Sequence, residues 1–165
     1  MDIKELFLKQ FNISYDQNGW FVALKNTLQN LTAEEAAWKP ENLDNSIWQI
    51  LAHLNYYNFA YLERFKGIDY VYPKADNDAT FEAAEDISDE VWQAEIARFE
   101  AIMEDWRGLL EIADEAKFDE KVSASSETTW EVLLSNLIQH NSHHGGQIVV
   151  IRKLQKSWDR SKGVY

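Results

Sequence analysis

Apolar residues recur at every third or fourth position along most of the chain, which is the spacing of one face of an α-helix and not the alternation of a β-strand. Only six glycines and two prolines interrupt this pattern. It therefore predicts four long amphipathic helices: the first at about Ile3–Leu31 with a kink at Asn18-Gly19, the second from Ser46 to about Gly67, the third following Ser88, and the fourth from after Thr128 to about Lys156.

Polar residues indicate where two of these helices begin. Ser46 is followed three residues later by Gln49, and Thr128 by Glu131. A Ser or Thr at this distance from a Glu or Gln is typical of a capping box, in which each side chain accepts a hydrogen bond from the other residue's backbone N–H. We therefore expect the second and fourth helices to begin at capping boxes, with Pro40 in the linker before the second.

The same spacing identifies residues expected in the core. In the first helix these are Phe7, Phe11, Phe21, Leu24, Leu28 and Leu31, and in the third Trp92, Phe99, Ile102, Met103, Trp106 and Leu110. Large aromatic residues at helical spacing are more often core or interface residues than parts of a ligand site. We expect this of Trp48, Trp92, Trp106 and Trp130.

Four amphipathic helices without a strand pattern predict an all-α four-helix bundle, with residues 1–165 as a single domain. The connection from Gly67 to Ser88 spans about 20 residues, whereas neighbouring antiparallel helices are usually joined by about two to eight. The length favours a bundle with a long crossover connection over a simple up-down-up-down order. Such a connection is also a place for a pocket lid or a subunit contact.

The composition excludes several classes of function. The chain has 16 Lys and Arg against 28 Asp and Glu, a net charge of -12, which repels nucleic acid and anionic lipid. It has no cysteine, so disulfides, thiolate nucleophiles and cysteine metal sites are excluded. No apolar run approaches the roughly 18 residues of a membrane span, and the first residues lack the basic region of a signal peptide. We expect a cytoplasmic protein that binds neither nucleic acid nor membrane.

Three of the four histidines lie within "QHNSHHGG" of the fourth predicted helix. His140 and His144 are one turn apart, on the face that carries Leu133, Leu137, Ile151 and Leu154. His53 lies on the inward stripe of the second helix with Ile50, Tyr57, Ala60 and Arg64. Three imidazoles are thus expected to face the interior of the bundle.

A buried imidazole without a partner costs a few kcal/mol, so these rings need hydrogen bonds or a cation. Two histidines four residues apart and a third from a facing helix match a three-nitrogen metal site with a position left for water or substrate. Zinc suits such ligands, and nickel, iron and manganese are not excluded. Gly145 and Gly146, which are unfavourable inside a helix, indicate close approach of another backbone or an opening beside the ligands.

Core histidines that are satisfied by hydrogen bonds alone are an equally good interpretation of this spacing, and tyrosines such as Tyr57 offer hydroxyls for it. His143 is expected at the edge of the stripe, on the surface or just behind the ligands. Gln147 could orient a ligand, contact a substrate or be a polar neighbour. Arg64 and Arg152 are further candidates for contacts with a substrate.

The segments "WKPENLDNSIWQILAHLNYY" and "QHNSHHGGQIVVIRKL" resemble the DinB-like superfamily of bacterial four-helix-bundle proteins, over essentially the whole chain. The resemblance assigns His53, His140 and His144 to the family's three metal-ligand positions and Gln147-Ile148 to its "GQI" ending. Gly145 stands where relatives often have Arg or another polar residue. The resemblance also implies a crossover topology, commonly a homodimer, and a divalent metal such as zinc or nickel.

Relatives include transferases of low-molecular-weight thiols, thiol-dependent isomerases and metal-dependent hydrolases. The resemblance thus implies a metal-dependent hydrolase or thiol S-transferase that acts on a small molecule, in which the metal lowers the pKa of water or thiol. The alternative is a non-catalytic dimeric bundle with a structural metal or none, for small-ligand binding or a stress-related role. No carboxylate is evident beside the ligands, so in a hydrolase the general base would be metal-bound hydroxide or His143.

Overall fold

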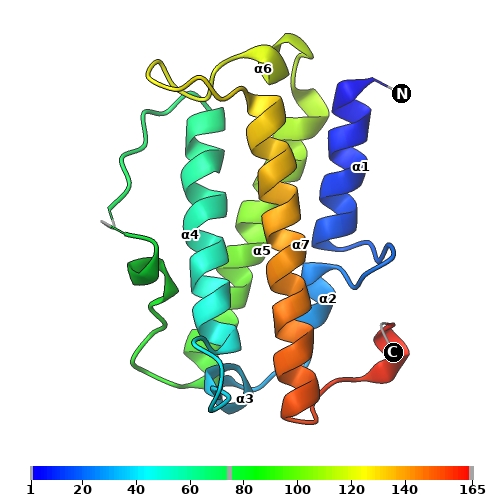
Figure 1. Cartoon of the computed structure of the whole chain (residues 1–165), viewed down its shortest axis with the longest axis vertical. Coiled ribbons are helices and arrows are strands. Elements are labelled where there is room, and N and C mark those ends of the chain that lie inside the picture. The colour runs from blue at the N-terminus through cyan, green and yellow to red at the C-terminus, as the bar shows by residue number, and fades with distance from the viewer. Residues whose placement is uncertain (1, 74–75, 164–165) are drawn as a thin grey trace.

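Four long helices form the protein, which is an all-α four-helix bundle with a long crossover connection (Figure 1). The structure is a computed structural model that describes residues 2–73 and 76–163. The long helices are α1 (Ile3–Tyr15), α4 (Ile47–Phe65), α5 (Asp89–Ile112) and α7 (Trp130–Leu154). Short helices lie in the connections: α2 (Leu24–Leu28), α3 (Ala33–Ala37), η1 (Asp78–Phe81), α6 (Ala116–Asp119) and η2 (Arg160–Lys162). None of the described helices is both long and apolar enough to span a membrane.

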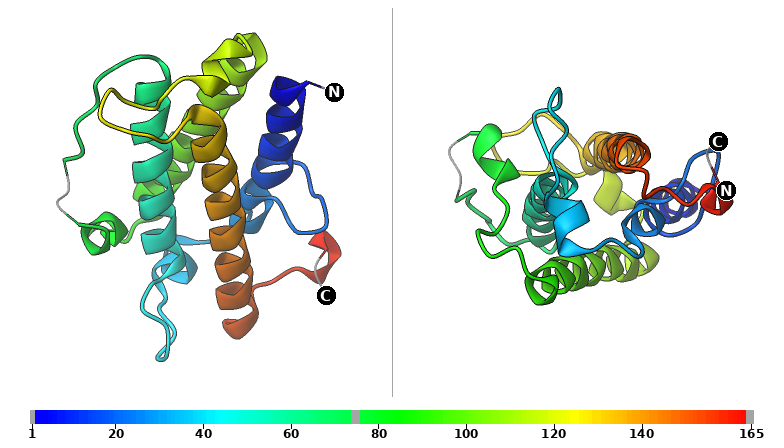
Figure 2. Two further views of the ribbon diagram at one scale, coloured as in Figure 1. Left: turned by 45° about the horizontal axis from the view of Figure 1, so that its top comes forward. Right: turned by 90° about the horizontal axis from the view of Figure 1, so that it is seen from below.

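The four long helices surround one core, and each packs against two others, as both views in Figure 2 show. Helices α4 and α5 run parallel: Trp48 meets Trp92 near their first turns, and Phe65 meets Trp106 further along. Helix α7 runs antiparallel to α4, so that Phe65 at the end of α4 contacts Trp130 at the start of α7. These directions bring the middle of α4 opposite the middle of α7.

The parallel pair α4 and α5 requires the chain to return along the whole bundle between them, which confirms the predicted crossover. Figure 1 shows this connection passing down the outer side of α4, with η1 halfway along it. Helix α4 begins at the predicted capping box of Ser46 and Gln49. It ends at Phe65, and Gly67 beyond it has a φ of 88°, which is accessible to glycine, while Ile68 N donates to Glu63 O.

The first predicted helix is wrong in its length: α1 ends at Tyr15, and residues 16–23 form a loop before α2. The Asn18 side chain accepts hydrogen bonds from the N–H of Ala23 and the amide of Asn26, so it stabilises the loop in place of continued helix. Gly19 packs closely on α1, where a Cβ would lie 2.7 Å from Ile13 Cγ2. The apolar period continues through α2, which is why the pattern resembles one long helix.

The capping box predicted at Thr128 and Glu131 is also wrong. Helix α7 begins after Thr129, and its first N–H groups receive no hydrogen bond from a capping side chain. Backbone pairing holds this end instead: Val122 N donates to Thr128 O and Trp130 N to Glu120 O. The polypeptide around Thr128 is therefore extended, in a short antiparallel bridge of Lys121 with Thr129.

The core residues predicted for the third helix are confirmed, because the six apolar residues of α5 predicted from their spacing are all buried. The tryptophans Trp48, Trp92, Trp106 and Trp130 are buried as well, and each is at most 1% exposed. Burying such a side chain removes about 150–250 Å² from water, so these residues dominate the core. Two predicted core residues are exposed, Phe21 in the loop before α2 and Leu154 at the end of α7.

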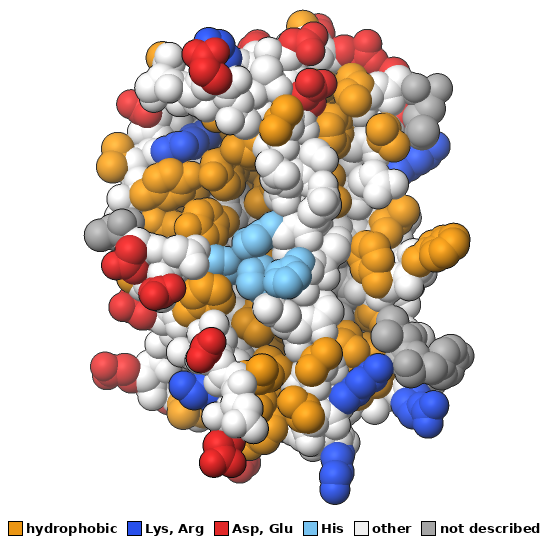
Figure 3. Space-filling view, viewed as in Figure 1, with side chains coloured by type: hydrophobic (Ala, Val, Ile, Leu, Met, Phe, Trp, Pro, Cys, Tyr) orange, Lys and Arg blue, Asp and Glu red, His pale blue; other side chains and the backbone are white. Residues whose placement is uncertain are grey.

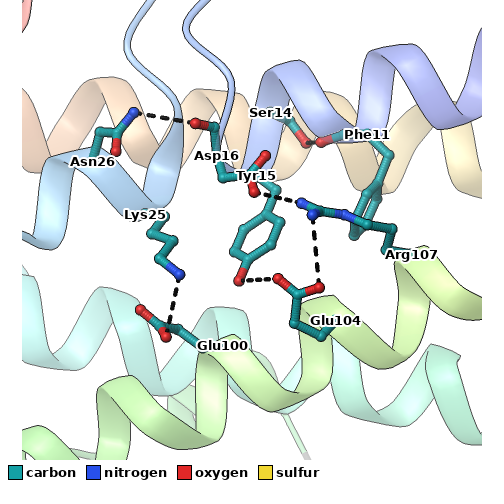
Figure 4. A network of polar contacts seen from close by, with 9 residues as sticks. All are labelled: Phe11, Ser14, Tyr15, Asp16, Lys25, Asn26, Glu100, Glu104 and Arg107. Carbon is teal, nitrogen blue, oxygen red and sulfur yellow. Dashed lines mark hydrogen bonds and ion pairs between the residues drawn. The ribbon is translucent and has the colours of Figure 1, made fainter.

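Polar contacts join α1 to α5 at the edge of this core (Figure 4). The buried Tyr15 donates from its hydroxyl to Glu104 at 3.0 Å, and burial together with this carboxylate raises the pKa of Tyr15. Arg107 lies over the Tyr15 ring and pairs with Asp16 at 2.6 Å. Lys25 pairs with Glu100 at 3.3 Å. These contacts fix the end of α1 on α5.

Inside the core, α4 and α7 are joined by two reciprocal hydrogen bonds. Asn58 Nδ2 donates to Asn141 Oδ1 at 2.9 Å, and Asn141 Nδ2 donates to Asn58 Oδ1 at 3.0 Å. Both side chains are fully buried, so neither amide has water as an alternative partner. A slip of one helix along the other would break both bonds. The pair therefore fixes which residues of α4 face which residues of α7.

We expect Asn141→Leu to lower the free energy of unfolding by about 1–3 kcal/mol, because it leaves the amide of Asn58 buried without its partner. The double variant Asn58→Leu with Asn141→Leu should cost clearly less than the sum of the two single variants. Chemical denaturation of all four proteins with a chelator present measures this. Additive losses would show that the two amides do not depend on each other.

Candidate metal centre

Three imidazole rings converge between α4 and α7. His53 projects from α4, while His140 and His144 project from consecutive turns of α7. His140 Nε2 lies 3.0 Å from His53 Nε2 and 3.1 Å from His144 Nε2, and one nitrogen of each ring lies within 4.8 Å of the other two. His53 and His144 are buried, and His140 is partly exposed. The structure thus brings together the three histidines expected from the sequence to meet.

The outer nitrogens of two rings have hydrogen-bond partners behind them. His53 Nδ1 lies 2.6 Å from Thr80 Oγ1, and His144 Nδ1 lies 2.6 Å from Gln147 Oε1. The Thr80 hydroxyl donates its proton to Asn77 O, so it can only accept from His53. Gln147 Oε1 is likewise an acceptor. Both rings therefore carry their proton on Nδ1.

This protonation leaves an unprotonated Nε2 on His53 and on His144, aimed at the same point. His140 Nε2 can supply one proton at most, so it can satisfy only one of these two lone pairs. His140 Nε2 lies about 3 Å from each of the other two nitrogens, and a single proton among the three leaves one lone pair unmatched. A cation placed among them would satisfy all three, so the residues present fit a divalent metal.

Burial keeps the three rings neutral. It is the main cause that lowers the pKa of His53 to about 3 and that of His140 to about 4, with further lowering by the neighbouring histidines. Burial also lowers the pKa of His144, against the hydrogen bond of Gln147, which raises it. Metal binding requires neutral imidazole, so these nitrogens are available as ligands without the loss of a proton.

The crossover connection forms one wall of this centre, which the sequence did not reveal. The Phe81 ring stacks on His53 with 3.9 Å between centroids, and Thr80 beside it is 2% exposed. Both residues belong to η1, a single turn without a periodic pattern. Tyr57 contacts the His53 ring edge-on at 5.0 Å. His53 is therefore held on both sides, by its own helix and by the connection.

A cavity of about 550 Å³ opens beside His140. Its lining includes Tyr57 and Arg64 of α4 and Leu137 of α7. Figure 3 shows the histidines in the middle of this face, beside a field of side chains of the hydrophobic class, in which tyrosine is included. The exposed side of His140 faces this cavity, so a molecule bound there would lie next to His140.

The other residues singled out in the sequence lie in different places. His143 is exposed, with its ring 5.2 Å from that of His144. Arg152 is buried away from the histidines and donates to the backbone carbonyls of Thr27, Gln29 and Ser157. Gly145 packs on the start of α2, where a Cβ would lie 3.6 Å from Leu24 Cδ1, while the space beside Gly146 is open. A Cβ at Gly145 would thus make an ordinary van der Waals contact, so the predicted close approach of another backbone is not found at either glycine.

Comparisons with known proteins agree with this architecture. The family model of the DinB superfamily matches residues 22–148. The crystal structure of a conserved protein from Enterococcus faecalis superimposes with a TM-score of 0.70, over 93% of this chain and 97% of that chain, at 16% sequence identity. At this identity the likeness shows the fold alone. No match was found among curated proteins.

We expect NMR of the metal-free protein to find the Nδ1–H tautomer for His53 and His144, and a neutral His53 ring even at about pH 5.5, where a free histidine is mostly protonated. The pKa of His53, about 3, lies below that of a free histidine, so its ring stays neutral at a pH at which a free histidine is protonated. In Thr80→Val the acceptor of His53 Nδ1 is gone, so His53 should shift toward the Nε2–H tautomer. An Nε2–H tautomer of His53 in the unaltered protein would contradict this account.

Proposed function

The chain belongs to the DinB superfamily, and from this premise we propose that it is an enzyme that holds a divalent metal through His53, His140 and His144 and acts on a small molecule in the adjoining cavity. Zinc and nickel are the proposed metals. The observation that carries the proposal is the convergence of the unprotonated His53 and His144 Nε2 atoms on His140 Nε2.

Each residue around the centre has a distinct part in this proposal. A divalent cation at the three nitrogens would lower the pKa of a bound water or thiol and so supply a nucleophile near neutral pH. Thr80 and Gln147 hold the protons of His53 and His144 on Nδ1 and orient the rings. Phe81 covers one face of His53 and keeps water from it.

The lining of the cavity bears on which nucleophile is used. Its described residues include no carboxylate that could act as general base or protonate a leaving group. Hydrolysis of a stable bond usually needs such a group. Addition of a thiol to an activated C=C bond forms the C–S bond as the π bond breaks, and the proton lost from sulfur to solvent is replaced by one that solvent gives to the adjacent carbon. The site therefore favours a thiol S-transferase over a hydrolase. The homodimer and the cytoplasmic location stay predictions from the sequence.

We expect protein made without a metal-affinity tag, incubated with zinc or nickel and desalted, to retain about one metal ion per chain. His144→Ala should lose this metal and remain folded, because it removes a ligand and one buried polar ring. His143→Ala is the matched control, an exposed histidine next in sequence, and should retain the metal. Elemental analysis and circular dichroism measure both effects. Equal metal content in the two variants would place the metal elsewhere.

A second experiment separates an enzyme from a bundle with a structural metal. The cobalt(II)-loaded protein should develop a near-ultraviolet charge-transfer band when 2-mercaptoethanol is added, because an open position accepts a thiolate. A closed four-coordinate site would leave the spectrum unchanged and would support the non-catalytic alternative. Tyr57→Phe, which preserves the cavity shape and leaves the three histidines in place, should behave like the unaltered protein.

A further inference from the structure

The cavity beside His140 extends along α4 as far as Arg64. Arg64 follows His53 by three turns of helix, about 16 Å along its axis. Tyr57 and Tyr61 lie between them on the same helix, and Tyr72 of the crossover connection also lines the cavity. Its volume of about 550 Å³ is in the range of sites for small organic molecules. His140 of the histidine centre and the guanidinium group of Arg64 thus line the same cavity.

The guanidinium group of Arg64 is fixed on two sides. Its Nε and one terminal nitrogen donate to Tyr70 O at 3.2 and 3.1 Å, and it lies over the Tyr72 ring at 4.3 Å from the centroid. Two of its five N–H groups are used in this way, and no described acceptor takes the other three. An arginine held by a ring and a carbonyl loses little entropy when it binds a ligand.

No described carboxylate forms an ion pair with Arg64. The chain carries a net charge of -12, yet Arg64 makes no ion pair with a described carboxylate, and no Asp or Glu is among the described residues that line the cavity. The adjacent Glu63 pairs with Lys66. Asp76 lines an adjoining cavity on the other side of Tyr57, Tyr61 and Tyr72, and it accepts a hydrogen bond from Ala79 N. The interior of the cavity is therefore positive in a strongly acidic protein.

We propose that the ligand of this cavity is a small organic carboxylate, whose carboxylate group is bound by the free edge of Arg64 and whose apolar or aromatic body lies on the tyrosines. A guanidinium fork matches a carboxylate in a bidentate geometry. The single positive charge of Arg64 balances the single negative charge of a carboxylate. The remaining polar residues of the lining, such as Ser123, Thr128 and Asn136, are uncharged. That this carboxylate is a substrate, with its reactive end near His140, rests on the proposed function. The binding of its carboxylate group by Arg64 does not require a metal.

The test uses 3-phenylpropanoate and its neutral analogue 3-phenylpropanamide as probes, with binding to the metal-free protein measured by calorimetry or ligand-observed NMR. A chelator is present because a carboxylate could also bind a metal directly. We expect the carboxylate to bind at least about tenfold more tightly than the amide, and Arg64→Gln to abolish this difference. Arg98→Gln, which removes the same charge from an exposed position of α5, should bind both probes as the unaltered protein does.

Further controls separate loss of charge from loss of shape. In Arg64→Gln the amide should bind as before, which shows that the cavity is intact, and Arg64→Lys should bind the carboxylate with intermediate strength because it keeps the charge without the fork. Equal binding of both probes, unchanged carboxylate binding in Arg64→Gln, or no binding of the carboxylate would overturn the proposal. Metal content is measured in parallel samples that are incubated with zinc or nickel, without chelator, and desalted: absent metal there, together with Arg64-dependent binding, would contradict the proposed function alone.

Discussion

The burial of three neutral imidazoles at one point between α4 and α7 is the constraint on which the rest of this structure depends. Polar rings in a core need partners for every nitrogen, and here the partners come from three separate parts of the chain: η1, α7 itself and the opposite helix. The reciprocal amides of Asn58 and Asn141 keep the two helices in the register that this meeting requires. Because α4 and α5 run parallel, the connection between them returns along α4 and brings η1 onto His53.

The sequence predicted most of the fold because helical spacing is a local property. A buried α-helix repeats its contacts every three to four residues, so the core residues of α5 and the inward histidines could be identified without knowledge of their neighbours. The first helix was predicted too long because α1 and α2 share one apolar period across a loop stabilised by the Asn18 side chain. The capping box at the start of α7 was wrongly predicted because the residues that pair with this end, 120–122, lie in another segment.

The candidate site could be predicted only in part, for a related reason. His53, His140 and His144 lie on regular helices, where position determines direction. Thr80 and Phe81 lie on a single turn whose contact with His53 depends on how the whole connection folds back. Arg64 was identified as a candidate, but its environment depends on Tyr70 and Tyr72 of that same connection. Residues of an irregular connection that pack against a helix far from them in sequence show no periodic pattern.

The position of Thr80 affects how fast a bound metal ion could enter and leave the histidine centre. The proton on His53 Nδ1 is held by one hydroxyl on a four-residue turn outside the bundle, not by a residue of the packed core. Displacement of that turn frees the ring to rotate and exposes it to water, while the four long helices stay assembled. Uptake and loss of a bound ion would then follow the opening rate of this segment, and would be much faster than the global unfolding of the protein.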